Sequence, residues 1–178
     1  MKAKPLLFIG LLSLLIVSGI INSENSKKPM IISHASWVKY YPDVKSLVED
    51  ADVIVEGEAE SIKSYPRFDE LDIATDVYFN VSKWYKGSEP KSRNKIIIEQ
   101  DGGVYNGVTR KLDKVEIMEP GKKYLLFLDY SPEEDKYAVL TGWQGQFKLG
   151  FFKAENPEPS RSMDKDKLYD EIARHNQR

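Results

Sequence analysis

Alternating apolar and polar positions predict two long β-strands in the first half of the chain. In VIVEGEAESIKSY (53–65), alternate residues are apolar or small, and three glutamates occupy positions between them. In TDVYFNVSKWYKG (75–87), the alternation holds to Ser82, after which Trp84 falls on the polar side. A period of two is typical of a strand with one buried and one solvated face. We therefore expect two half-buried strands, with either a bulge near Ser82 or a Trp84 that covers the opposite face.

Shorter apolar runs predict the remaining strands. Residues 95–99, 137–141 and 146–152 each have strand character, and 104–113 is either a loop or an irregular hairpin. Residues 124–128 are apolar at every position, so both faces of that strand should be covered. Gly57, in the middle of the first long strand, indicates a bend or a close approach of two backbones. These features predict a small curled sheet.

Two helices are expected, one at each end of the sheet-forming region. Asp43 is a candidate N-cap, followed by apolar residues at helical spacing through residue 51. This helix should pack on the outer face of the strand at 124–128. A second helix is predicted within 162–174, where Leu168 and Ile172 lie one turn apart. Its apolar face is thin, so we expect loose attachment.

The N-terminus has the pattern of an export signal. Lys2 and Lys4 precede a mainly apolar run at 6–21, and polar residues follow it. This pattern is typical of a cleaved signal peptide or of an N-terminal hydrophobic helix that remains as a membrane anchor, and both alternatives stay open. Residues 6–21 are the only expected membrane contact. The rest of the chain should be extracytoplasmic, either secreted or anchored to the outer face of the cell membrane.

The predicted organisation has four parts. They are a signal peptide or anchor at 1–21, a linker at 22–42, a β domain at 43–152, and a polar tail with a short helix at 153–178. The chain has no cysteine, which excludes a lipidated-cysteine anchor and any disulfide. A cysteine-free exported protein fits a bacterium, most readily a Gram-positive one.

Charge and motif content narrow the classes of function. The formal net charge is -2, without the basic surplus of a nucleic-acid-binding protein, so no nucleic-acid partner is expected. The only histidines, His34 and His175, lie far apart in the sequence, and no nucleophile-elbow, phosphate-loop or zinc-protease motif occurs. We assign no catalytic residue, no metal site and no cofactor.

The order of the motifs resembles a known family. A helix leads into ADVIVEG (51–57); a strand ending in WYKG (84–87), the run III (96–98) and PGKKYLLFL (120–128) follow. Over about residues 43–150 this resembles bacterial exported domains related to the netrin-like and metalloprotease-inhibitor (TIMP-like) group. The resemblance implies a mainly β fold with an OB-like barrel of five or slightly more strands and flanking helices. The inhibitors reach the protease zinc through an N-terminal cysteine, which this chain lacks, so no functional residue is transferred.

Two glycine-rich loops are the candidate ligand-binding sites. DGGVYNG (101–107) offers Asp101, Tyr105 and Asn106, and GWQGQF (142–147) offers Trp143 and Gln144. Glycines permit positive φ and close backbone approach, so these loops are suited to present aromatic and amide groups to a glycan or peptide. The alternative is that both are tight turns with the aromatic residues packed in the core.

Acidic residues offer weaker candidates. Asp69, Glu70 and Asp72 are possible Ca²⁺ ligands but lack the calcium-loop spacing, and a solvated loop is the alternative. The three glutamates of the strand at 53–65 are interpreted as solvent-facing, or as a patch that attracts cations.

Three functions remain open. The first is a non-enzymatic binding module, exported or membrane-tethered, for a protein or cell-envelope component. The second is an extracellular hydrolase that uses carboxylates such as Asp69, Glu70 and Asp101. The third is a structural envelope protein whose partner is another copy or a membrane complex.

Overall fold

The fold comes from a computed structural model that describes residues 29–34, 39–87 and 94–176. The predicted signal or anchor at 1–21 lies outside the described residues, as does most of the predicted linker. Within the described ranges, no helix has the length and apolar character needed to cross a membrane.

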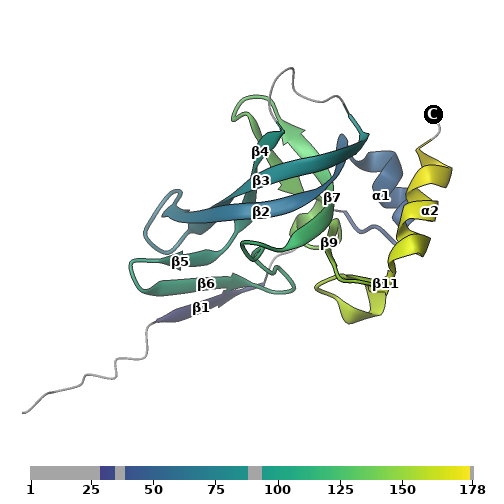
Figure 1. The fold of residues 1–178 in the computed structure, drawn as a ribbon. Helices are drawn as coiled ribbons and strands as arrows, with labels where there is room; N and C mark the ends of the chain where they lie inside the picture. Colours follow the sequence, from purple (N-terminus) through teal and green to yellow (C-terminus); the bar gives the residue numbers. More distant parts are fainter. Residues whose placement is uncertain (1–28, 35–38, 88–93, 177–178) are drawn as a thin grey trace, which may run out of the picture.

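Five strands close into a mixed β-barrel, which confirms the predicted OB-like architecture (Figure 1). They are β2 (Val53–Pro66), β3 (Ile73–Lys86), β4 (Lys95–Asp101), β7 (Lys123–Ser131) and β8 (Lys136–Val139). Around the barrel the order is β7-β2-β3-β4-β8, and β8 pairs again with β7. All pairings are antiparallel except β4 with β8. This parallel pair brings the end of β4 beside residues that come nearly forty positions later.

The barrel interior is filled by the apolar positions that the alternation predicted. Val55, Ala59, Val77 and Phe79 are completely buried there. The pairing of β2 with β3 shifts register after Val81, so that Ser82 is the bulged residue. The bulge turns Trp84 onto the barrel core and Tyr85 toward the helices, which confirms the first of the two alternatives for this strand.

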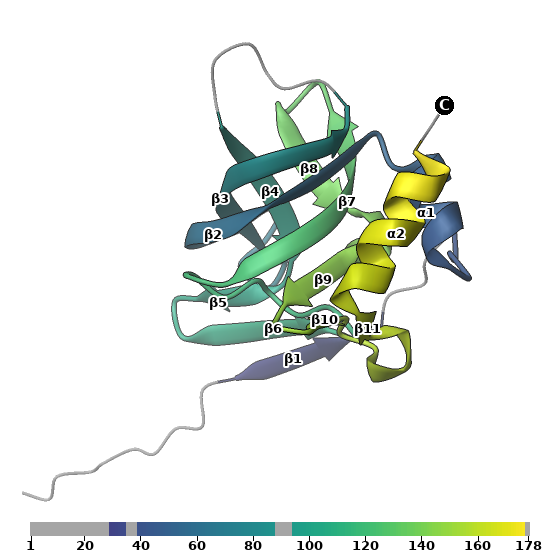
Figure 2. The same cartoon turned by 45° about the vertical axis from the view of Figure 1, so that its right-hand side comes forward.

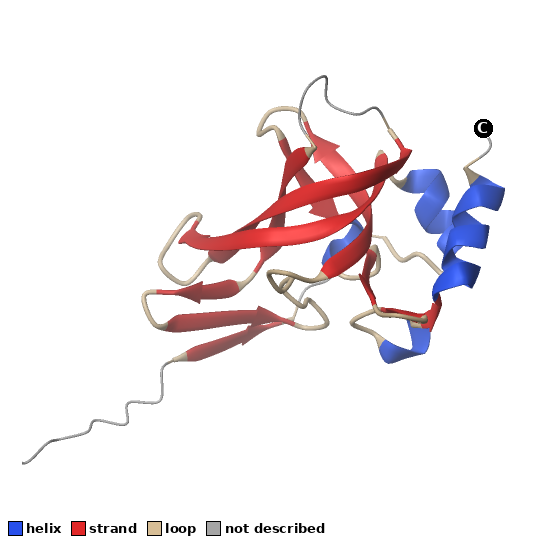
Figure 3. Ribbon diagram, in the orientation of Figure 1, coloured by secondary structure: helices blue, strands red, loops and turns tan. Residues whose placement is uncertain are grey.

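A second core lies between the barrel and two helices on one flank (Figure 3). The helices α1 (Val44–Asp50) and α2 (Lys165–His175) pack against each other and cover Leu125 and Phe127 of β7. Strand β7 is therefore covered on both faces, as its unbroken apolar run predicted. Asp43 caps α1 by accepting a hydrogen bond from the Ser46 amide at 2.8 Å.

The expectation that the C-terminal helix attaches loosely is wrong. Leu168 is 0% and Ile172 is 1% exposed, so both residues of the narrow apolar stripe are buried against the rest of the fold. Polar anchors supplement it: Tyr169 donates a hydrogen bond to the Glu56 carboxylate at 3.1 Å, and its ring stacks on Tyr85. Three short strands lead from the barrel to this helix: β9 (Gln146–Leu149), β10 (Lys153–Glu155) and β11 (Met163–Asp164).

A separate three-stranded sheet lies below the barrel (Figure 2). It consists of β1 (Met30–Ser33), β6 (Val108–Leu112) and β5 (Gly103–Tyr105). Strands β5 and β6 form the hairpin that was one of two interpretations of 104–113. Strand β1 runs parallel to β6 and lies inside the segment predicted as a linker, so that part of the segment belongs to a sheet. Two single-turn 3₁₀ helices complete the described elements, at Leu140–Gly142 and Pro159–Arg161.

Candidate functional site

A groove lies on the part of the barrel where the topology favours ligand binding. OB-type barrels bind ligands on the face of their second and third strands and between the loops that follow strands one and four. In this chain these are β3, β4, the β2–β3 loop and the β7–β8 turn. The groove has a volume of about 220 Å³, and its lining includes Arg67, Glu99, Asp101, Asp129, Tyr130, Glu134 and Lys136.

Lys136 is the centre of a charge network on one side of this groove. Its Nζ donates to the Asp76 Oδ1 at 2.8 Å, to the Tyr65 hydroxyl at 2.9 Å and to the Glu99 Oε2 at 3.1 Å. Asp76 and Glu99 lie directly opposite each other on β3 and β4. Like charges in that position repel. Lys136 at the start of β8 and the hydroxyl of Tyr65, which donates to both carboxylates, compensate them.

Arg67 extends the network into the β2–β3 loop. Its guanidinium donates to Glu99 and Asp72, each at 3.2 Å, and also to Asp101. Arg110 of β6 donates to the same Asp72 oxygen, Oδ1, and to the carbonyl of Ile73 at 3.2 Å. The loop is thus tied to β4 and to the lower sheet by partly buried ion pairs. Such pairs are screened less than exposed ones and fix the positions of the groups that line the groove.

Three groups of the network, Tyr65, Glu99 and Lys136, have pKa values that keep their protonation states fixed at neutral pH. Burial and the hydrogen bond to Glu99 raise the pKa of Tyr65 to about 12. Burial alone would raise the pKa of Glu99, but the hydrogen bonds from Tyr65 and Lys136 outweigh it and hold that pKa below its ordinary value. Burial would lower the pKa of Lys136, yet its bonds to Asp76, Tyr65 and Glu99 raise it. Groups of this kind order a surface and do not exchange protons near pH 7.

Replacing Glu99 with glutamine is expected to reduce the loss of stability in acid. Because the folded protein holds the Glu99 pKa below its ordinary value of 4.5, Glu99 stabilises the fold above that pH. This contribution is lost as the pH falls through the lower, folded pKa. Urea unfolding from about pH 7 to about pH 3 should therefore show a steeper decline for the wild type than for Glu99→Gln. Equal slopes would contradict this assignment, and Glu49→Gln on α1 is the control for the same change of charge.

The opposite side of the groove carries Asp129, which forms no salt bridge with any of the described residues, although the charge of Lys39 acts on it. Burial, followed by repulsion from Asp52 and Asp50, raises the pKa of Asp129 above its ordinary value. Beside it, the ring of Tyr130 is partly exposed and lies 4.8 Å from the ring of Tyr137, centroid to centroid. A cation placed here would relieve the repulsion on Asp129 and contact an aromatic face.

The structure separates the five ligand-binding residues predicted from the sequence. Asp101 lines the groove, as one partner of Arg67. Tyr105 ends β5 and Asn106 begins the β5–β6 turn, and neither is among the residues that line the groove. Trp143 and Gln144 are 5% and 1% exposed, which matches the alternative that their loop packs in the core.

Gln144 has a structural role that explains its burial. Its side-chain oxygen accepts from the Tyr41 amide at 3.1 Å, and its nitrogen donates to the Tyr41 carbonyl at 2.9 Å. These two bonds hold the segment before α1 against the barrel. Both polar ends of the side chain are therefore already engaged, and Gln144 has little capacity left for a ligand.

The acidic candidates are also largely engaged within the fold. Asp72 pairs with two arginines, and Asp69 accepts hydrogen bonds from the amides of Leu71 and Asp72 at 2.8 and 2.9 Å. In the part of the chain that the structure describes, no group of three or more histidines, cysteines or acids is arranged to hold a metal ion. Of the three strand glutamates, Glu56 accepts from two tyrosines and Glu60 pairs with Lys95. The solvated or structural interpretation is thus favoured for these acids.

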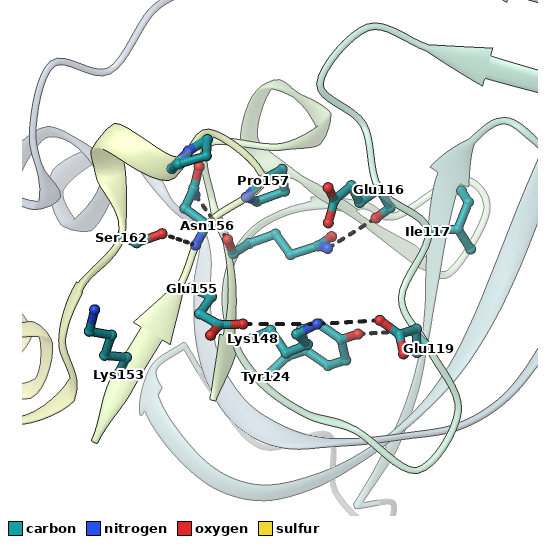
Figure 4. A pocket seen from close by; sticks show the side chains of 12 residues that line it. Glu116, Ile117, Glu119, Tyr124, Lys148, Lys153, Glu155, Asn156, Pro157 and Ser162 are labelled. Atoms are coloured by element: carbon teal, nitrogen blue, oxygen red, sulfur yellow. Dashed lines mark hydrogen bonds and ion pairs between the residues drawn. The ribbon is translucent and has the colours of Figure 1, made fainter. Parts of the chain in front are cut away.

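Two larger concavities lie next to the loop at 113–122. One, of about 440 Å³, is lined by polar side chains, and Figure 4 shows Lys148 between Glu119 and Glu155. The hydroxyl of Tyr124 accepts from the Glu119 amide there, at 2.9 Å. The other, of about 600 Å³, separates Ile62 of β2 from Val104 of β5. In the first, Lys148 is paired with both Glu119 and Glu155. Neither is bordered by the β7–β8 turn.

The chain matches no protein-family model, and no curated protein matches it. Its function is therefore inferred from the groove, the charges around it and the topology of the barrel.

Proposed function

We propose that this protein is an exported, non-enzymatic binding module that receives a cationic segment of a protein partner in the cell envelope. The groove between β4 and the β7–β8 turn is the proposed binding site. The observation that carries the proposal is that the barrel places this groove where OB-type folds bind ligands, between the first and fourth connecting loops. Export rests on the apolar run at 6–21, and the domain is either released or held at the membrane by it.

The sign of the charge favours a cationic ligand. The ion-pair network contains three cations, Arg67, Arg110 and Lys136, against four carboxylates, Asp72, Asp76, Glu99 and Asp101. The β2–β3 loop adds Asp69 and Glu70, and the β7–β8 turn adds Glu133, Glu134 and Asp135. Such a surface repels nucleic acids and anionic polymers, and it attracts basic partners during diffusional encounter.

A protein ligand is favoured over a simple cation because apolar groups border the same acids. Phe68 and Leu71 on the β2–β3 loop are 90% and 57% exposed, and Tyr130 lies on the far side of the groove. A peptide with a basic side chain between apolar residues would satisfy both kinds of contact. Exposed aromatic residues next to charged ones are typical of protein interaction surfaces.

The other two hypotheses fit this geometry less well. A carboxylate hydrolase needs an acid and a base with pKa values suited to proton transfer, whereas Asp101 is paired with Arg67 and Asp69 caps its own loop. A structural envelope role would not need a groove lined by acids such as Asp129 and Glu134, which form no salt bridge within the described residues. The resemblance to the netrin-like and TIMP-like group remains a prediction, and inhibition through an N-terminal cysteine is not proposed.

The proposal predicts salt-sensitive binding of basic peptides. In a fluorescence-polarisation assay, peptides with Lys or Arg next to aromatic residues should bind saturably, and their acidic counterparts should not. The double variant Asp129→Asn/Glu134→Gln should weaken binding about tenfold, since two exposed or partly exposed charge contacts each contribute up to about 1 kcal/mol. Tyr130→Ala should weaken it further.

The matched control is Asp166→Asn/Asp170→Asn on the exposed side of α2, which changes the net charge equally. An equal loss of binding in this control would mean that only overall charge matters and would overturn the assignment of the groove. Absence of saturable binding by every basic peptide would overturn the proposed ligand class.

A further inference from the structure

The turn between β9 and β10 exposes two adjacent phenylalanines that do not line the groove. Phe151 is 82% and Phe152 is 72% exposed, and their rings contact each other edge to face with centroids 4.4 Å apart. Single exposed apolar residues are common, but two contiguous aromatic rings at the end of a turn form a patch that needs an explanation. The two rings pack only partly on each other, so most of their surface faces water.

This turn is held by hydrogen bonds on both sides. The Gly150 amide donates to the Lys153 carbonyl at 2.8 Å, which closes the turn. The Lys165 amide donates to the Phe152 carbonyl at 2.9 Å and fastens the turn to the start of α2. The Lys165 Nζ also reaches the Gly150 carbonyl at 3.4 Å. The phenylalanines are therefore presented by a fixed backbone next to the start of α2.

Three lysines lie close to the turn along the chain or at the start of α2. Lys153 follows Phe152 directly, and Lys165 and Lys167 begin α2 beside the turn. Among the described residues, none of these three lysines forms a salt bridge. The nearby Asp164 uses its carboxylate to cap α2, where it accepts from the Asp166 amide at 2.9 Å. Asp166 is the remaining acid in this first turn, so the positive charges outnumber the free negative ones.

We propose that this turn is a membrane-contact site for an anionic lipid surface. Phe151 and Phe152 would enter the boundary between headgroups and acyl chains, and Lys153, Lys165 and Lys167 would contact the lipid phosphates. Aromatic apolar groups with lysines beside them are the combination that binds bilayer interfaces, with apolar groups buried about 5–10 Å deep. This site consists of the β9–β10 turn, the start of β10 and the start of α2, and it is distinct from the proposed peptide groove.

The N-terminal run at 6–21 makes a lipid surface the favoured occupant. If that run stays in the membrane, only the residues at 22–29 separate it from β1. Fully extended, eight residues span about 28 Å, so the domain would lie close to the bilayer. A tether of this length keeps the turn at a high effective concentration next to the lipid surface, so a contact that is weak by itself is sufficient. A second copy of the chain, joined through the phenylalanines, is the competing occupant.

The absence of cysteine from the sequence allows a direct test with the full-length chain. Phe152→Cys provides a single site for the environment-sensitive fluorophore NBD, and Glu134→Cys on the opposite turn provides a control site. Each labelled protein is incorporated in phosphatidylcholine vesicles with or without phosphatidylglycerol. We expect a blue-shifted, several-fold brighter signal, quenched by lipid-borne quenchers, only at position 152 and only with phosphatidylglycerol. Because the label reports on its own position, binding through the N-terminus does not mimic this result.

Two further variants test which side chains of the turn cause the signal, and the dependence on protein concentration separates lipid contact from a contact between copies. In the Phe152→Cys background, Phe151→Ser and Lys153→Glu/Lys165→Glu should each abolish most of the signal change, and Phe68→Ser should leave it unchanged. A label at position 152 that stays in water on phosphatidylglycerol vesicles would overturn the proposal. A blue shift that grows with protein concentration without lipid would also overturn it and would identify a second copy as the occupant.

Discussion

Replacing Gly57 with alanine is expected to lower the free energy of unfolding by about 3 kcal/mol or more. A Cβ atom at this position would lie 2.2 Å from the carbonyl oxygen of Asn80 and 2.6 Å from the ring of Phe79. The obstruction is backbone of the neighbouring strand, which cannot rotate away as a side chain can. Strands β2 and β3 would have to separate next to the register shift at Ser82. The short distance to Asn80 also confirms the close approach of two backbones that Gly57 indicated in the sequence.

Chemical denaturation of Gly57→Ala beside Gly121→Ala provides the test. Gly121 has a φ of +76° with open space around its Cβ position, so its replacement adds backbone strain without a steric overlap. That strain costs about 1–2 kcal/mol. If Gly57→Ala is no less stable than Gly121→Ala, the close approach of β2 and β3 is not a constraint on the fold.

Replacing Leu168 with alanine is expected to cost about 2–5 kcal/mol, the range for truncation of a fully buried leucine. Leu168 is one of the few apolar side chains that fasten α2 to the second core. Its loss leaves a cavity between the helix and the barrel that neighbouring side chains fill incompletely. The expected result is a lower unfolding midpoint and faster hydrogen exchange in α2.

Leu71→Ala is the matched control, since Leu71 is 57% exposed in the β2–β3 loop. It should change stability by less than about 0.5 kcal/mol. Comparable losses for the two variants, or an α2 that exchanges as slowly after Leu168→Ala as before, would show that the helix is not held by this contact.

The two proposed surfaces assign separate roles to the same small domain. The groove residues Lys136 and Arg67 are fixed by ion pairs that keep the barrel face ordered, which reduces the entropy lost when a ligand binds. Phe151 and Phe152 belong to an extension outside the barrel, next to α2. Variants of one surface should therefore leave the function of the other intact, because the sites share no residue.

Much of the fold was predictable because it depends on local periodicity. The alternation in 53–65 and 75–87 identified the strands and their buried faces, and the unbroken apolar run at 124–128 showed that both faces of β7 are covered. Asp43 was recognised because an N-cap needs only residues within one turn. The sequence predicted too weak an attachment of α2. A stripe of two apolar residues does not show that Leu168 and Ile172 are fully buried or that Tyr169 bonds to the barrel.

Local patterns did not predict the candidate groove, and Asp101 is the one predicted binding residue that lines it. Lys136 and Tyr65 are 71 residues apart, and their contact depends on the parallel pairing of β4 with β8 that closes the barrel. A shift of one residue in that register would move Glu99 to the other face of its strand and break the network. The sequence by itself determined the strands, their buried faces and the acidic character of the loops, because these follow from neighbours along the chain. Only the tertiary structure decided which charges meet, because side-chain contact depends on the register and closure of strands far apart in sequence.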